Sequence, residues 1–311
     1  MGNEVKRRLV LAGMLLAAAA SGRAEDVEDR GAASHAVGTD LFFSTDADDT
    51  DVIRAAIDLD WSWEGPEEYR GIRLERVWFN PLGQGWRERE RIYLRAADRL
   101  GGWKWNGRLG TDGTTLVGAA AIHNEAPHRQ EYFVEREIVE TPQGLARGLY
   151  STFAGAALDV PADDRHLFTL VAGLQEYSGD NVRTHFRASY IHEARRDWGL
   201  TVQLRTRWFH NSVPREFDYY SPRWYAQLLP VAQVRRFSGG WQWLLAAGLG
   251  VQRDSATGWR RSSHVDARVT SPATRDWAFS AALLYSETPT VSGFSYDYLQ
   301  LTLGVRRAFR P

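Results

Sequence analysis

The chain has 311 residues, a formal net charge of −1, no cysteine and a mean hydropathy of −0.42. The near-zero charge excludes the strongly basic balance typical of nucleic-acid-binding proteins, and the missing cysteine excludes a disulfide framework. No nucleic acid is therefore expected among the partners, and the high aromatic content, 12% of the chain, is the unusual part of the composition.

Residues 1–24 are predicted to be a secretory signal peptide. A basic segment from Lys6 to Arg8 precedes an apolar run from Leu9 to Ala20, and small residues lead up to Ala24. This order of basic, apolar and small-residue regions is typical of signal peptides. The alternative, a transmembrane anchor, needs about 20 apolar residues, which is more than this run supplies. We therefore expect Sec-type secretion and a short periplasmic segment at residues 25–36.

Apolar and polar residues alternate in long segments over the rest of the chain. In "VIRAAIDLDW" every second residue from Ile53 to Trp61 is apolar, and mostly charged residues lie between them. The closing stretch "YDYLQLTLGVRRAFRP" repeats this pattern from Leu299 to Phe309, with Arg307 as its exception. A two-residue period predicts β-strands, because an amphipathic helix would place apolar residues three and four positions apart.

About sixteen such segments are predicted, and stretches rich in turn-forming residues, such as "EGPEE" and "SGDN", separate them. Their expected spans are 37–45, 51–62, 70–80, 88–98, 102–111, 114–123, 130–140, 147–159, 165–177, 181–193, 198–210, 219–236, 240–253, 259–271, 275–287 and 296–309. The stretch "VETPQGLARG", between two of them, is compatible with a single helical turn.

A closed antiparallel transmembrane β-barrel of about 16 strands, at residues 37–311, explains these segments best. A soluble β-sandwich also alternates, but its strands average about five to six residues, whereas membrane strands need about 9 to 11. Aromatic residues near the predicted strand ends and arginine on the polar face also favour a barrel, since a sandwich core could not hold that arginine. We therefore predict an all-β monomer in contact with the lipid of the bacterial outer membrane.

The last strand is expected to pair with the first, because a barrel that spans a membrane can leave no strand edge unpaired. An aromatic residue near the end, Phe309, resembles the signal that the outer-membrane assembly machinery recognises in its clients. That machinery is therefore an expected partner, although Arg310 and Pro311 follow the aromatic residue here.

The inward faces of the predicted strands carry about fifteen basic and about six acidic residues. Arginine binds carboxylates and phosphates through two parallel hydrogen bonds, and charged rings in a pore select cargo by its sign. The excess predicts a conduit for an anionic cargo; the alternative is that inward charges pair across strands and only fill a polar interior. The candidate cargo-binding residues are Arg91, Arg95, Arg183, Arg187, Arg205, Arg207 and Arg268.

A catalytic alternative to transport lies at "FHNS", where His210 and Ser212 would share one strand face with Asn211 between them. An outer-membrane phospholipase uses His and Ser at this spacing, but the rest of its sequence context is missing here. The paired Asp163 and Asp164 lie in a predicted turn, and the eight His residues show no metal-ligand spacing. We therefore predict no enzyme activity, no cofactor and no metal site.

Several stretches in the second half, "GLQEYSGDNVRTHFRASY", "EFDYYSPRWYAQLLPVAQVRRF" and "GLGVQRD" among them, resemble the C-terminal barrels of bacterial exporters of cellulose and poly-N-acetylglucosamine. The small YaiO-type barrels are a second comparison. The first resemblance implies a 16-stranded channel for exopolysaccharide export, with polysaccharide as its cargo. A separate periplasmic helical-repeat protein is expected to supply the scaffold that such exporters carry. The alternatives are a plugged barrel of structural or receptor type and, third, a barrel hydrolase.

Overall fold

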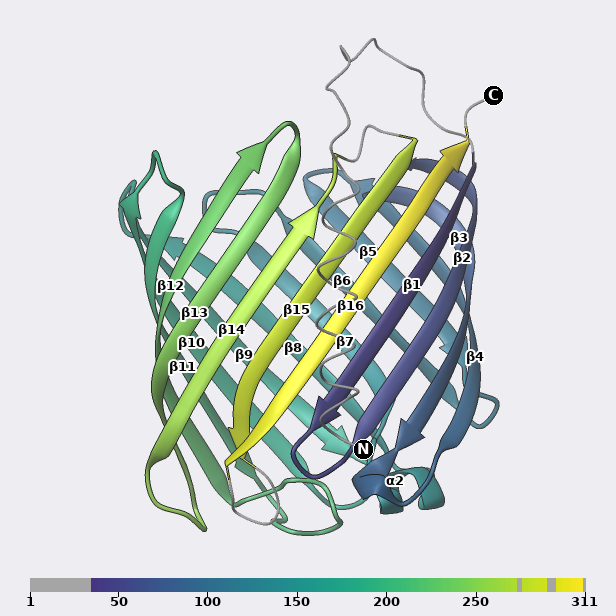
Figure 1. Cartoon of the computed structure of the whole chain (residues 1–311), viewed down its shortest axis with the longest axis vertical. Helices are drawn as coiled ribbons and strands as arrows, with labels where there is room; N and C mark the ends of the chain where they lie inside the picture. The colour runs from purple at the N-terminus through teal and green to yellow at the C-terminus, as the bar shows by residue number, and fades with distance from the viewer. Residues whose placement is uncertain (1–34, 273–275, 290–294, 310–311) are drawn as a thin grey trace. The chain divides into compact units, whose positions relative to one another are not determined.

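The protein is a closed barrel of sixteen antiparallel strands, each hydrogen-bonded to its neighbours in sequence (Figure 1). The computed structural model describes residues 35–272, 276–289 and 295–309. β16 pairs with β1, so that Phe309 lies opposite His35 and Leu303 opposite Leu41. The predicted all-β barrel of 16 strands and the predicted pairing of its last strand with its first are therefore confirmed. The predicted signal peptide and most of the predicted periplasmic segment lie outside the described residues.

Most elements begin and end within three residues of their expected bounds. The strands are β1 (His35–Asp46), β2 (Asp51–Gly65), β3 (Glu68–Asn80), β4 (Arg87–Leu100), β5 (Trp103–Thr111), β6 (Leu116–Asn124), β7 (Gln130–Ile138), β8 (Tyr150–Pro161), β9 (His166–Tyr177), β10 (Val182–Arg195), β11 (Leu200–Asn211), β12 (Trp224–Ser238), β13 (Trp241–Asp254), β14 (Arg260–Thr270), β15 (Trp277–Pro289) and β16 (Ser295–Phe309). A 3-10 turn, η1 (Pro81–Gly83), and a short helix, α2 (Pro142–Arg147), complete the described elements. Neither helical element in the described ranges is long and apolar enough to span a bilayer.

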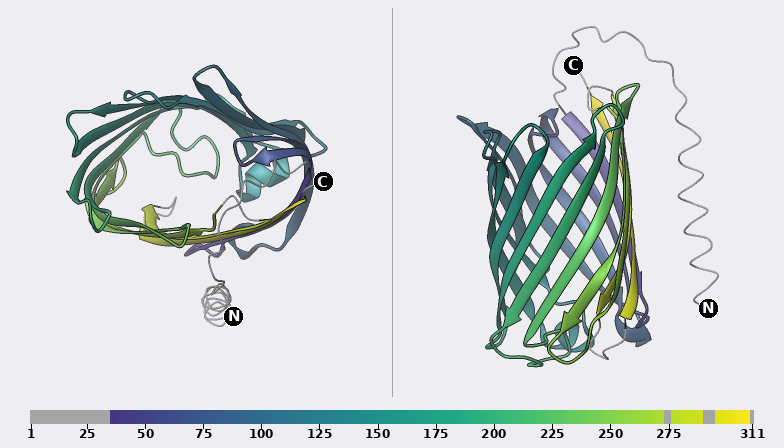
Figure 2. Two further views of the ribbon diagram at one scale, coloured as in Figure 1. Left: turned by 90° about the horizontal axis from the view of Figure 1, so that it is seen from above. Right: turned by 90° about the vertical axis from the view of Figure 1, so that its left-hand side faces the viewer.

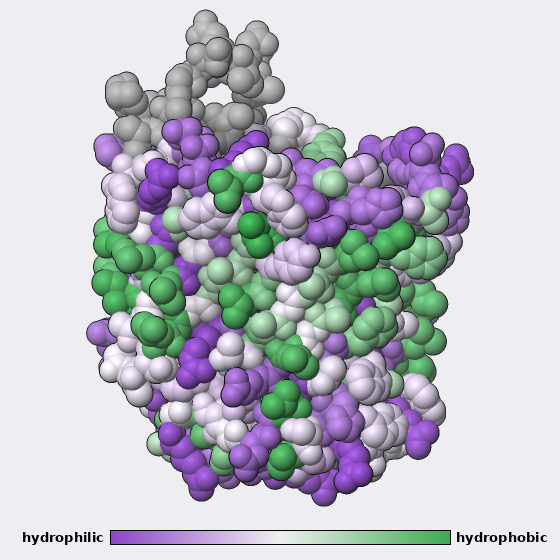
Figure 3. Space-filling model, turned by 180° about the vertical axis from the view of Figure 1, so that it is seen from behind, coloured by the Kyte–Doolittle hydropathy of each residue, from purple (hydrophilic) through white to green (hydrophobic). Residues whose placement is uncertain are grey.

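The strands alternate between an outer apolar face and an inner polar face. On β4, the side chain of Leu94 points outward and is 66% exposed, whereas the neighbouring Tyr93 points into the barrel and is 1% exposed. On the face shown in Figure 3, apolar side chains gather over the middle of the outer surface, and polar side chains are more frequent above and below them. A soluble monomer rarely exposes so continuous an apolar surface, whereas a transmembrane barrel requires one.

The two ends of the barrel differ in their connections. β1 begins and β16 ends at the same end, so each described loop that follows an odd-numbered strand lies at the opposite end (Figure 1). We call this opposite end the loop end. Two long connections lie there, at residues 139–149 and 212–223, whereas the turns at the other end are short. The two long connections at the loop end are therefore the segments that can fold over the lumen.

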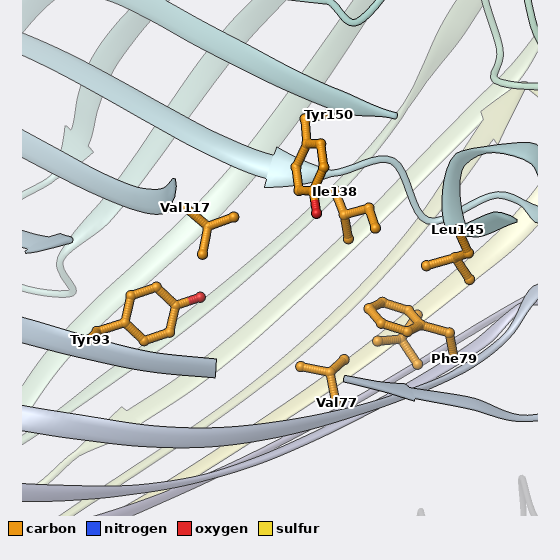
Figure 4. Close-up of a cluster of buried hydrophobic side chains, with 8 residues drawn as sticks. Val77, Phe79, Tyr93, Val117, Ile138, Leu145 and Tyr150 are labelled. Carbon is orange, nitrogen blue, oxygen red and sulfur yellow. The ribbon is translucent and has the colours of Figure 1, made fainter. Parts of the chain in front are cut away.

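Helix α2 folds inward at the loop end (Figure 2). The Thr141 side chain caps its N-terminus, Pro142 starts it, and Gly148 ends it in the left-handed conformation. Leu145 packs into a buried cluster on the inner wall (Figure 4). The members of that cluster are Val52, Val77, Phe79, Tyr93, Val117, Ile138, Leu145 and Tyr150. The expected single helical turn is confirmed, and it narrows the lumen.

One strand begins later in the structure than the sequence pattern predicts. β12 was expected from residue 219 but starts at Trp224, because residues 212–223 form a loop that bends into the lumen (Figure 2). Pro222 has no N–H to give to a strand ladder, and the buried Tyr219 packs on the inner wall. The aromatic residues just before β12 therefore belong to the lumen and not to the outer surface.

Candidate functional site in the lumen

One half of the inner wall is a network of ion pairs, centred on Asp58 of β2. Its carboxylate forms an ion pair with Arg95 of β4 and accepts hydrogen bonds from Arg306 of β16 at 2.8 Å and from Arg73 of β3 at 3.2 Å. The side chain of Asp58 is only 1% exposed, so this carboxylate is compensated by protein and hardly by water. We call Asp40, Asp58, Asp60, Arg73, Glu75, Arg91, Arg95, Glu137 and Arg306 the ion-pair network.

The network crosses the line where the barrel closes. Arg306 reaches from β16 over β1 to Asp58 on β2, and its path runs past Gly38 of β1. A Cβ atom on Gly38 would lie 3.1 Å from two nitrogens of that guanidinium and 3.4 Å from the Cβ of Asp58. A glycine at this position therefore leaves space for an ion pair between strands that are not neighbours.

Two predicted cargo-binding residues belong to the network. Arg91 lies 3.1 Å from a Glu75 oxygen and 3.0 Å from a Glu137 oxygen, and its side chain is fully buried. Arg95 pairs with Asp58 and lies 3.4 Å from Asp60. Carboxylates in the wall thus compensate both guanidinium groups. For these two residues, the structure agrees with the alternative in which inward charges pair across strands and only fill a polar interior.

The opposite half of the wall carries arginines without carboxylates. Arg183 and Arg187 of β10 and Arg205 and Arg207 of β11 all point into the barrel, and Arg187 lies directly opposite Arg207 in the strand register. We call these four the arginine patch. Within the described ranges, none of the four makes an ion pair. The charges of Arg187 and Arg207 repel each other, because like charges directly opposite in a sheet are destabilising. This wall therefore has a positive potential that an anion would relieve.

Neutral groups hold two members of the arginine patch in place, Arg183 and Arg205. Arg183 donates from Nε to Asn211 Oδ1 at 2.8 Å and from its terminal nitrogen to the backbone carbonyl of Tyr220. Arg205 donates to Gln203 Oε1 at 2.9 Å, and its Nη1 lies 3.3 Å from His264 Nε2. These contacts fix the guanidinium groups without cancelling their charge.

Of the seven predicted residues, the structure brings four together. Arg268 lies apart on β14, donates to both oxygens of Asp266 at 2.8 and 2.9 Å, and keeps 60% of its side chain exposed. Of the predicted arginines, those on β10 and β11 therefore line the lumen without carboxylate partners. The other three, Arg91, Arg95 and Arg268, have carboxylate partners.

The loop at residues 212–223 is held down by two of its carboxylates. Glu216 accepts from the backbone N–H groups of Asp180 and Asn181, and a Cβ on Gly179 would clash with this carboxylate at 2.3 Å. Asp218 accepts from Thr141 Oγ1 at 2.6 Å and from the backbone N–H of Gln143 at 2.7 Å, at the start of α2. The two inward structures of the loop end are thereby linked across the mouth of the barrel.

Between this loop and the wall lies a cavity of about 300 Å³. Its lining is Val139, Ser151, Gln175, Tyr177, Arg183, Arg207, Phe209, Tyr219, Tyr220 and Tyr225. The sequence pattern did not predict that its aromatic residues line the lumen. One signal was present in "YYSP", because its proline argues against a strand that starts at Tyr219. Burial and a hydrogen bond to Asp254 raise the pKa of Tyr220, so its hydroxyl stays neutral. The cavity combines aromatic rings with two members of the arginine patch.

The residues weighed for hydrolysis do not converge. His210 points outward and stacks on Trp208, with ring centroids 6.3 Å apart, while Ser212 accepts from the backbone N–H of Val182 at 2.8 Å. Asn211 points to the opposite face, into the lumen, where it bonds to Arg183. Because Asn211 lies on the other side of the sheet, it cannot orient His210 as a general base.

No protein-family model matches the chain, and no curated protein matches it. Among solved structures, a "Bacterial polysaccharide outer membrane secretin" matches with a TM-score of 0.67 and 12% identity, over 88% of this chain and 98% of that one. OccD3 of Pseudomonas aeruginosa matches with a TM-score of 0.46 and 9% identity, over 88% of this chain and 91% of that one. Identities this low concern the fold alone. The chain therefore has the fold of the 16-stranded outer-membrane β-barrels.

Proposed function

We propose that this protein is an outer-membrane channel that exports an anionic exopolysaccharide. The apolar outer surface suits a bilayer, and one solved structure of similar fold is described as a bacterial polysaccharide outer membrane secretin. The observation that carries the proposal is the arginine patch, which leaves four guanidinium groups on one wall of the lumen without carboxylate partners in the described chain.

The chemistry of the patch suits a cargo that must both enter and leave. At Arg183 and Arg205, carboxylates of a polymer would meet guanidinium groups that neutral groups already orient, so little side-chain freedom is lost on contact. In a water-filled lumen each such contact is screened and weak. Repeated weak contacts along one wall favour passage over retention.

The first prediction concerns ion selectivity. Changing Arg187, Arg205 and Arg207 together to Gln should shift the channel from anion toward cation preference, because the wall loses its positive potential while staying polar. The measurement is the reversal potential of the purified protein in planar bilayers under a salt gradient. A control variant with Gln at Arg70, Arg196 and Arg236, which are exposed outside the lumen, loses the same charge and should keep its selectivity.

An unmoved reversal potential in the patch variant would contradict the proposal. The same recording addresses a second candidate, a plugged barrel of structural or receptor type. The link between Asp218 and the start of α2 favours that candidate, because it closes part of the mouth. A wild-type protein that folds and inserts but carries no current under any voltage would support the plugged barrel instead.

A further inference from the structure

The cavity at the loop end has the composition of a carbohydrate site and not of a packing defect. Ligand pockets of about 300–1,000 Å³ are typically lined by aromatic groups with a few oriented polar groups. This cavity is lined by five aromatic rings, two arginines and the amide and hydroxyl of Gln175 and Ser151, and by no carboxylate. Its volume is sufficient for one sugar ring, and its charge suits an acidic one.

Stacking on one another holds the aromatic rings of the cavity in fixed positions. Tyr177 and Tyr219 stack with centroids 4.1 Å apart and a 7° angle between planes, and Phe209 and Tyr225 stack at 4.8 Å and 17°. Tyr220 stands edge-on to Phe209, at 88°. Rigid aromatic groups supply large contact areas at a small cost in conformational entropy. The carbon-bound hydrogens on the face of a pyranose can pack against such surfaces and leave water.

The two arginines differ in how far they are satisfied. Arg183 is held over the rings of Phe209 and Tyr177, at 4.6 and 5.2 Å, and its donors are used on Asn211 and on the Tyr220 carbonyl. The guanidinium carbon of Arg207 lies 5.7 and 5.8 Å from the ring centroids of Phe209 and Tyr225, and its Nε is buried with no hydrogen-bond partner in the described part of the chain. A buried donor without an acceptor is costly, and an anionic oxygen would satisfy it.

We propose that this cavity binds a single carboxylated sugar unit of the cargo, a hexuronate, with Arg207 contacting the carboxylate and the tyrosine rings that line the cavity contacting the sugar. The site rests on the proposed function in that the sugar belongs to the exported polymer. The loop at residues 212–223 completes the site, because it supplies Tyr219 and Tyr220.

The test is binding of digalacturonate to the purified full chain in detergent micelles, by isothermal titration calorimetry. Its methyl ester has the same rings without the charge, and should bind at least about tenfold more weakly, as expected when a charge-assisted contact is lost. Arg207→Gln should remove most of this preference for the acid. Tyr219→Ala should weaken both ligands, whereas Tyr219→Phe, which keeps the ring, should keep both affinities. Arg70→Gln is the control for loss of one positive charge.

Equal affinity for the acid and its ester, or an unchanged preference in Arg207→Gln, would overturn the site. Tyr219→Phe answers the objection that Tyr219→Ala merely disorders the loop, because a loss of ring binding in Ala together with retention in Phe requires the aromatic face. The outcomes are separable from those of the bilayer recording. A channel whose selectivity follows the arginine patch but which does not bind digalacturonate keeps the proposed function and loses this site.

Discussion

Asp58→Asn is expected to lower the free energy of unfolding of the barrel by about 3–5 kcal/mol, the usual cost of leaving buried charges uncompensated. The carboxylate of Asp58 is shared by three guanidinium groups that come from three different strands. The amide of Asn carries no charge, so Arg73, Arg95 and Arg306 would repel one another around it. The effect should appear as a lower urea midpoint in tryptophan fluorescence of the protein refolded into lipid vesicles.

The matched control is Glu88→Gln on β4. Glu88 also accepts from an arginine, Arg76, at 2.7 Å, but both side chains are about half exposed on the outer face. An exposed pair of this kind contributes only about 0–1 kcal/mol. If Asp58→Asn costs no more than Glu88→Gln, the ion-pair network does not hold the barrel together and its charges act independently.

Leu204→Arg is expected to destabilise the barrel by about 2–4 kcal/mol in a bilayer, as arginine does near the midplane of other transmembrane barrels. Leu204 lies near the middle of β11, points outward and is 40% exposed, opposite Tyr190 and Pro230. A guanidinium there would have to leave the hydrocarbon or draw water into it. Unfolding in urea from lipid vesicles measures the loss.

Ala157→Arg is the companion variant, because Ala157 points into the lumen opposite Glu131 of β7. The new guanidinium would lie in water beside a carboxylate, and little stability should be lost. Gln203 is a poorer comparison, although it also faces inward, because its amide bonds to Thr201 and Arg205. Equal tolerance of Leu204→Arg and Ala157→Arg would mean that the outer apolar face does not meet lipid.

The strands were predictable because each one carries its own two-residue period. The inward or outward direction of Arg187, Arg205 and Leu204 follows from that period alone, whatever their neighbours are. The pairing of charges could not be predicted in the same way. Arg306 and Asp58 are 248 positions apart and lie on strands separated by β1. Their contact depends on the stagger between strands of the closed barrel, which local sequence does not encode.

The cavity was missed for a different reason. Tyr219 and Tyr220 continue an apolar and aromatic stretch into β12, so the pattern extended the strand backwards through residues that belong to a loop. What places them in the lumen is long-range: Glu216 binds the backbone of Asp180 and Asn181, and Asp218 binds the start of α2. A loop fixed by contacts to two other loops carries no periodic signal that a single sequence could reveal.

The division of the inner wall makes two properties of the barrel independent of each other. The ion-pair network lies on β1, β2, β3, β4, β7 and β16, whereas the arginine patch lies on β10 and β11, so we expect stability to depend on the first and the charge offered to a solute on the second. Substitutions on β10 and β11 can therefore alter the preferred solute without unfolding the protein. We expect related barrels that serve different polymers to differ first at Arg187, Arg205 and Arg207. They should retain Asp58 and also Gly38, which leaves space for the ion pair between Arg306 and Asp58.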